Sequence, residues 1–205
     1  KMYWSSDSTS SKIFELKYSG GAWVKTVATD AAPLNAKYLI ANSGRVFAYD
    51  ESNNDIYVST ILPNLASTST LFTLGGTTIN PFKVGTGAET VTGMYSWVGT
   101  NVVVFCENSV YLVDTNPLTA ATATAGNATS TFTIRQVSNK SGCVSHRSAA
   151  QVGEDLFYLS KDGVRSLKRT MAEEMVASTA GVISYPIQDL IDSINWSAAV
   201  QQASA

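Results

Sequence analysis

The single histidine is the residue around which catalysis would be organised. His146 follows Ser145 and is close in sequence to Cys143, Glu154 and Asp155. A Ser/His/Asp or Cys/His set acts by nucleophilic attack, and it requires the groups to meet in space with the nucleophile on a tight turn. The chain has no Gly-x-Ser-x-Gly motif, and adjacent side chains on an extended segment point to opposite faces. We therefore predict that His146 has no catalytic role and that the chain is not an enzyme.

The acidic run at residues 50–55, Asp-Glu-Ser-Asn-Asn-Asp, offers oxygen ligands at the close spacing of a calcium loop. An EF-hand loop requires a glycine at its sixth position and a distant glutamate, and the run has neither. A polar hairpin tip explains the same composition without an ion. The sequence also has no phosphate-binding loop and no dinucleotide fingerprint. We predict neither a metal site nor a cofactor.

Charge and cysteine usage exclude two further classes of site. Arg165, Lys168 and Arg169 are close together in a chain of net charge −2, a balance that implies no broad nucleic-acid-binding face. We interpret this cluster as the solvated end of a strand. Cys106 and Cys143 have the spacing of neither a zinc site nor a redox motif, and we predict unpaired structural thiols. No apolar run approaches the 18 residues of a membrane span.

Carbohydrate chemistry is the alternative that stays open. Trp4, Trp23, Trp97 and Trp196 have ring faces of the kind that stack on sugars, although aromatic residues in strands usually pack in the core. A glycosidase also needs two carboxylates flanking the scissile bond. The acidic residues of this chain fall mostly at turns, and no such pair is assigned. A carbohydrate-binding or glycosidase-type propeller is therefore the rival prediction.

The elements that would position these residues are short hairpins that recur along the chain. The clearest instances are residues 44–59, 101–113 and 155–167. From Val46 to Val102 is 56 positions, and from Val102 to Leu156 is 54. Units of several strands at such a period bury their faces by stacking on neighbours and are typical of propeller blades. The recurrence predicts an architectural scaffold.

Local patterns predict the individual elements. Two alternating runs at 13–18 and 22–27 flank a Gly-Gly turn and predict a hairpin. The most apolar run, 102–106, predicts a central strand buried on both faces. Residues 115–131, rich in Thr and Ala, predict an exposed loop. Apolar residues at helical spacing predict one helix over 186–196. The predicted fold is all-β: one partial β-propeller-like domain over 1–205, with blades of short antiparallel strands and one C-terminal helix.

Several of these segments resemble a known family. The sequence Ser-Gly-Cys-Val-Ser-His-Arg-Ser at 141–148, and the hairpin at 152–167 that follows it, resemble a segment of tailed-bacteriophage structural proteins. These are the β-propeller tail nozzle or tail-tube proteins of short-tailed phages. The hairpins at 44–59 and 97–113 and the predicted helix region 184–196 are similar to that family too. The resemblance touches most of residues 40–196.

The resemblance implies a structural protein of the virion, located in the phage tail and assembled as a homo-oligomeric ring around the tail channel. Its partners would be other tail or connector subunits, and no membrane is involved. We expect the contacts to include the loop 115–131 and the chain near 196–205. A lumen of low or negative charge would pass DNA without the tight phosphate binding that Lys and Arg produce. The resemblance also implies a longer protein that begins before Lys1 and continues past Ala205.

Overall fold

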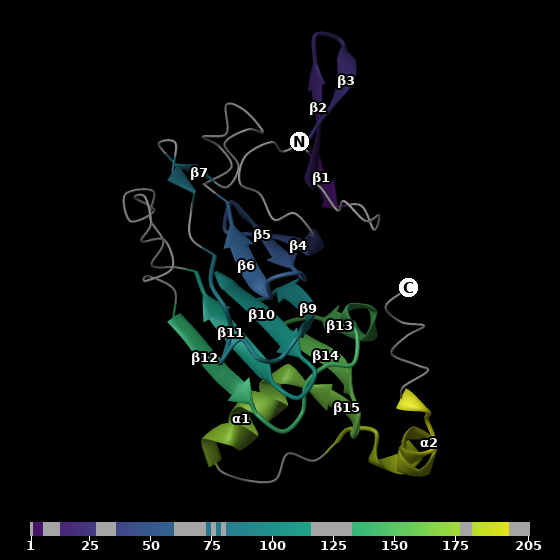
Figure 1. Cartoon of the computed structure of the whole chain (residues 1–205). Helices are drawn as coiled ribbons and strands as arrows, with labels where there is room; N and C mark the ends of the chain where they lie inside the picture. The colour runs from purple at the N-terminus through teal and green to yellow at the C-terminus, as the bar shows by residue number, and fades with distance from the viewer. Residues whose placement is uncertain are drawn as a thin grey trace. The chain divides into compact units, whose positions relative to one another are not determined.

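The computed structural model describes residues 2–5, 13–27, 36–59, 73–74, 77–78, 81–115, 133–176 and 182–196. The chain forms two compact units. The first comprises Lys1–Gly87, Gly99–Asn101 and Asp114–Thr133, and the second Ala88–Val98, Val102–Val113 and Ile134–Ala205. Both are built mainly from antiparallel sheets (Figure 1). This confirms the all-β class, while the propeller arrangement of the sheets stays a prediction.

The described residues of the first unit form three small sheets. One has the order β1 (Met2–Ser5), β2 (Ile13–Ser19) and β3 (Ala22–Val27). The second has the order β4 (Ala36–Asn42), β5 (Arg45–Asp50) and β6 (Asp55–Val58), and the third pairs β7 (Thr73–Leu74) with β8 (Thr77–Thr78). The β2–β3 turn uses Gly20 and Gly21, both at positive φ (61° and 83°), where glycine has no steric penalty. The predicted Gly-Gly hairpin is confirmed.

In the second unit, the part that the structure describes forms two sheets and the helices α1 and α2. One sheet has the order β12 (Thr133–Ser138), β11 (Val110–Asp114), β10 (Asn101–Cys106) and β9 (Val91–Ser96). The other has the order β13 (Ala149–Val152), β14 (Asp155–Ser160) and β15 (Gly163–Ser166). The hairpins β5–β6, β10–β11 and β14–β15 lie where the recurring pattern predicts them. In each case a further antiparallel strand, β4, β9 or β13, pairs with the first strand of the hairpin.

The core of the second unit is centred on the aromatic side chain of Phe105 in β10. Its ring lies 4.9 Å from that of Tyr158 and 6.0 Å from that of Tyr95, centroid to centroid. Every residue from Val102 to Cys106 is buried, with at most 1% exposure. The prediction of a central strand buried on both faces is therefore confirmed. Other buried members of the same cluster are Val103, Val110, Val137, Cys143, Leu156 and Leu167.

The helices differ from the prediction. Helix α1 (Leu167–Val176) follows β15 directly and packs against β14 and β15 (Figure 1); the prediction of a single helix is wrong in this respect. The N–H of Lys168 donates to Asp155 Oδ1 (3.1 Å), and that of Arg169 donates to Ser166 Oγ (3.1 Å). These bonds satisfy N–H groups that the first turn of a helix cannot pair internally. One of the two acceptors, Asp155, comes from a different strand, so local sequence does not reveal it.

The predicted helix at 186–196 is shorter than expected. A 3₁₀ turn at Tyr185–Ile187 precedes α2, which spans Gln188–Asp192. Ile191 is the buried residue of α2. Most of the stability of a helix in a protein comes from packing of its apolar face. Here only Ile191 packs in this way, so the helix forms over only part of the segment that has helical spacing. The predicted loop at 115–131 lies outside the described residues except for Thr115, which is buried.

Candidate functional site

The contacts of His146 pack a turn against a strand. His146 begins a 3₁₀ turn, His146–Ser148, and its ring stacks on Tyr95 at 4.7 Å between centroids. The Tyr95 hydroxyl donates to the carbonyl oxygens of His146 and Ala149, the latter at 3.3 Å. Gly93 leaves the space for this arrangement, since a Cβ there would lie 3.0 Å from the Cα of His146. The imidazole is thus used as a packing surface between β9 and the turn.

The predicted nucleophiles near His146 are not activated. Burial raises the pKa of the Cys143 thiol, and its Sγ donates to the carbonyl oxygen of Ser145 at 3.1 Å. Burial raises the pKa of Cys106 to about 11 and that of Tyr95 to about 12. A reactive cysteine needs a lowered pKa and a thiolate. Both thiols are buried and unpaired, as predicted.

No Ser/His/Asp arrangement forms from the residues that the sequence brings close. The Oγ of Ser145 accepts the N–H of Arg147 at 3.3 Å, which makes it the cap of the 3₁₀ turn. The carboxylate of Asp155 accepts from the N–H of Leu156 (2.8 Å) and from the hydroxyl of Ser166 (2.5 Å), beside the start of α1. A catalytic Asp would instead orient the imidazole. The Asp155 carboxylate is therefore used at the start of α1, and the absence of a catalytic role for His146 stays a prediction.

We expect the one titration near neutral pH to appear as a stability effect. Burial, and then the charge of Arg147, lower the pKa of His146. The unfolded state therefore binds the proton first, so the free energy of unfolding should fall as the pH drops below 6.5 and level off below the folded-state pKa. One proton limits the slope to about 1.4 kcal/mol per pH unit. Denaturant unfolding of wild type and His146→Gln from pH 8 to 5 measures it. Identical pH dependence in the two proteins would contradict the assignment.

The acidic run at 50–55 forms the tip of the β5–β6 hairpin, and its polar groups bond both within that tip and to the segment around Gly87. Asp50 accepts from the N–H of Ser52 at 2.9 Å and from Asn53 Nδ2 at 3.4 Å. Asn54 Nδ2 donates to the carbonyl oxygen of Gly87 at 2.7 Å. Across the described part of the chain, no three His, Cys, Asp or Glu residues are placed to hold a metal ion. The polar-tip interpretation accounts for this run.

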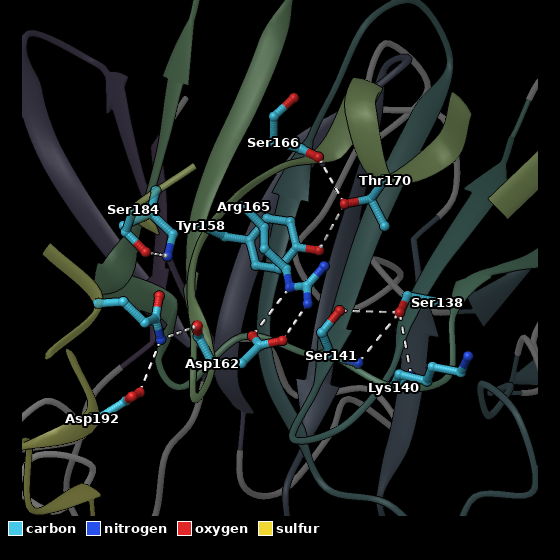
Figure 2. Close-up of polar contacts among 12 residues, drawn as sticks. Ser138, Lys140, Ser141, Tyr158, Asp162, Arg165, Ser166, Thr170, Ser184 and Asp192 are labelled. Carbon is cyan, nitrogen blue, oxygen red and sulfur yellow. Dashed lines mark hydrogen bonds and ion pairs between the residues drawn. The ribbon is translucent and has the colours of Figure 1, made fainter. Parts of the chain in front are cut away.

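The basic cluster is not a common surface. Arg165 is 8% exposed and its guanidinium forms a two-point ion pair with the carboxylate of Asp162 (Figure 2), with Nε 3.1 Å from Oδ1. Burial raises the pKa of Asp162, but hydrogen bonds from Arg165 and Ser160 outweigh it, and the pKa is lowered. Lys168 pairs with Glu154 at 3.0 Å. The solvated-strand-end interpretation is wrong for Arg165, because its side chain is buried and its charge pairs with the carboxylate of Asp162.

The segment after α1 is attached to the edge of β15 by hydrogen bonds. The N–H of Ile183 donates to the carbonyl oxygen of Val164 at 2.8 Å, and the N–H of Val164 donates to Ser184 Oγ at 3.0 Å. Gln188 Nε2 donates to the carbonyl oxygen of Asp162 at 3.0 Å. Together with buried Ile191, these contacts hold the backbone of residues 183–191 in a defined position.

This anchored segment presents apolar side chains to solvent. We call them the C-terminal apolar patch: Ile183, Tyr185, Ile187 and Leu190, with exposures of 40%, 79%, 50% and 66%. Exposed apolar groups gathered in one place mark interaction sites more often than scattered ones do. Sequence reasoning placed apolar residues at helical spacing here and assigned them to packing. Their common exposure is the signal that it missed.

Two of the tryptophans, Trp97 and Trp23, differ in whether they pack against the core. Trp97 packs against the core of the second unit, and its Nε1 donates to the carbonyl oxygen of Glu154 at 3.1 Å. Trp23, on β3 of the first unit, is 65% exposed, and its neighbour Val24 is 40% exposed. The expectation that strand tryptophans are core residues is therefore right for Trp97 and wrong for Trp23. Successive side chains of a strand point to opposite faces, so Val24 lies on the other face of β3 from Trp23. We call Trp23 the hairpin tip.

Among the described residues, no helix combines the length and the hydrophobicity needed to cross a lipid bilayer. Comparison with known proteins adds no assignment: no protein-family model matches the chain, and no curated protein matches it. The candidate functional site is therefore a surface, the C-terminal apolar patch, with the hairpin tip as a second exposed apolar surface.

Proposed function

We propose that this chain is a non-enzymatic structural protein of a bacteriophage tail, which assembles with copies of itself and with other tail subunits into a ring. The observation that carries the proposal is the C-terminal apolar patch, four apolar side chains exposed on a segment that hydrogen bonds anchor to β15. A surface that is already ordered loses little conformational entropy on binding, which favours a permanent contact. The family resemblance of residues 40–196 supplies the location, the virion.

The chemistry of the described residues supports a role without catalysis. The thiols have raised pKa values, the imidazole is stacked on Tyr95, and Asp155 caps α1. The polar groups with strong contacts hold elements together: Asp162 with Arg165, and Ser184 with Val164. An assembly protein uses polar contacts in this way and leaves apolar side chains for its partners.

The test is to look for the chain in purified particles. Virions purified by density gradient are analysed by quantitative mass spectrometry, with a major capsid protein as the copy-number reference, and the tails are imaged by cryo-electron microscopy. We expect a fixed copy number per particle and density for the chain in a ring of the tail. Recovery of the chain only from the soluble lysate, with none in particles that remain infectious, would exclude the proposal.

A further inference from the structure

The chain carries two exposed apolar surfaces of different make-up. The hairpin tip is the tryptophan of β3, which shares its face of the strand with Lys25, while the C-terminal apolar patch is a tyrosine and three aliphatic side chains around the 3₁₀ turn Tyr185–Ile187 and α2. Trp23 at 65% exposure is large and rigid, the kind of side chain that anchors interfaces. The patch offers aliphatic side chains and a tyrosine ring for such an anchor to cover.

The two surfaces lie in segments of opposite charge. Residues 1–37 carry five lysines and three acidic residues, a net charge of +2, and residues 170–205 carry four acidic residues and no lysine or arginine, a net charge of −4. The charges adjoin the apolar groups. Lys25 is an exposed residue of β3, two positions after Trp23, and Asp189 and Asp192 are exposed residues of α2, beside Leu190 in sequence.

We propose that the hairpin tip of one copy docks on the C-terminal apolar patch of the next copy, with Lys25 facing Asp189 and Asp192. The occupant of the patch is thus a second copy of this chain. This inference rests on the proposed function, because it names the contact from which a ring would be built. An interface between two different surfaces is heterologous, and repetition of it gives a closed ring or an open filament.

Charge selects this arrangement over a symmetric one. A two-fold contact of patch on patch would bring Asp189 and Asp192 of both copies together, and a two-fold contact of tip on tip would bring the two Lys25 side chains together. Juxtaposed like charges oppose association, whereas opposite charges across an interface favour the correct partner. Tip on patch pairs apolar with apolar and positive with negative, so both kinds of complementarity point to the same partner.

The decisive experiment mixes two variants that each lack one surface. The tip variant carries Trp23→Ser, and the patch variant carries Tyr185→Ser and Leu190→Ser, both in the full chain. Sedimentation velocity across a wide concentration range should show self-association of wild type and a monomer for each variant alone. Mixed in equal amounts, the variants should form a heterodimer and nothing larger, because one intact tip and one intact patch remain.

Controls separate the contact from general effects on folding. Val152→Ser removes a valine that is 62% exposed on β13, outside both surfaces, and should leave association at the wild-type level. Far-ultraviolet circular dichroism should be unchanged in all variants, because every substituted side chain is exposed. Lys25→Glu should weaken association at least about tenfold. Adding Asp189→Lys and Asp192→Lys to the partner should restore it.

The outcomes divide cleanly. A wild-type chain that stays monomeric, variants that associate like wild type, or a mixture that stays monomeric would each overturn the inference. Self-association of one variant alone, with the other variant monomeric, would overturn it in favour of a two-fold contact through the surface that the associating variant keeps. These measurements need no phage particle. If the variants complement each other and the chain is missing from virions, the proposed function fails while the contact stands; if the chain is in virions and the mixture stays monomeric, the contact fails alone.

Discussion

Phe105→Ala should lower the free energy of unfolding by about 3 to 5 kcal/mol, the usual cost of removing a buried phenylalanine ring. Phe105 is fully buried, and its ring contacts the rings of Tyr95 and Tyr158 in the core of the second unit. Truncation removes buried apolar surface and leaves a cavity between β10 and β14. Close neighbours such as Tyr158 are held by their own contacts, so the cavity should collapse only in part. Denaturant unfolding followed by near-ultraviolet circular dichroism measures the loss.

The matched control lies in the same four-stranded sheet. Ile134, on β12, is 38% exposed, so Ile134→Ala removes apolar atoms that already contact water. We expect Ile134→Ala to cost less than about 1.5 kcal/mol, since less surface is returned to solvent and no closed cavity forms. Equal losses for the two variants would show that the core is not centred on Phe105.

Gly142→Ala should cost at least about 3 kcal/mol, or prevent folding of the second unit, through overpacking. A Cβ at Gly142 would lie 2.0 Å from the carbonyl oxygen of Cys106 and 2.7 Å from the carbonyl carbon of Glu107. Both are backbone atoms, so no side-chain rotation relieves the clash. The N–H of Cys143 also donates to that carbonyl oxygen at 3.1 Å. Any shift that makes room for the methyl group weakens this bond, and thermal unfolding by circular dichroism reads out the result.

A second glycine isolates the effect of space from that of backbone conformation. Gly153, in the β13–β14 turn, has φ +61°, and a Cβ there would meet nothing within 4 Å. Gly153→Ala should cost about 1 to 2 kcal/mol, the strain of an L-residue in the left-handed region. If Gly142→Ala proves as mild as Gly153→Ala, the close approach of residue 142 to β10 is not what holds that connection in place.

The pattern of strands was accessible from sequence because it depends on near neighbours. The β2–β3 hairpin follows from two alternating runs around Gly20 and Gly21, and the continuous apolar run of β10 correctly predicted burial on both faces. Pairing across a short turn involves residues within about ten positions of each other, so composition and spacing contain the needed information. The polar tip at 50–55 was predicted on the same basis.

The bounds of the helices, and whether an individual side chain is buried or exposed, could not be predicted in this way. Helix α1 was not predicted, and Asp155, which caps its start, comes from another strand. The burial of Arg165 depends on the carboxylate of Asp162 and on packing around it. Trp23 and Trp97 are identical in chemistry and both were predicted in strand-like sequence, yet one is exposed and the other packs on the core.

By itself, the sequence determined an all-β chain of short antiparallel hairpins with one strand buried on both faces, because alternation, turn glycines and apolar runs act over a few residues. The tertiary structure alone decided which apolar groups face solvent. Ile187 and Leu190 have the spacing of a packed helix, and they are exposed because hydrogen bonds to Val164 and Asp162 and the burial of Ile191 hold the opposite side of the segment. Exposure is set by what lies across the fold, and spacing along the chain does not carry that information.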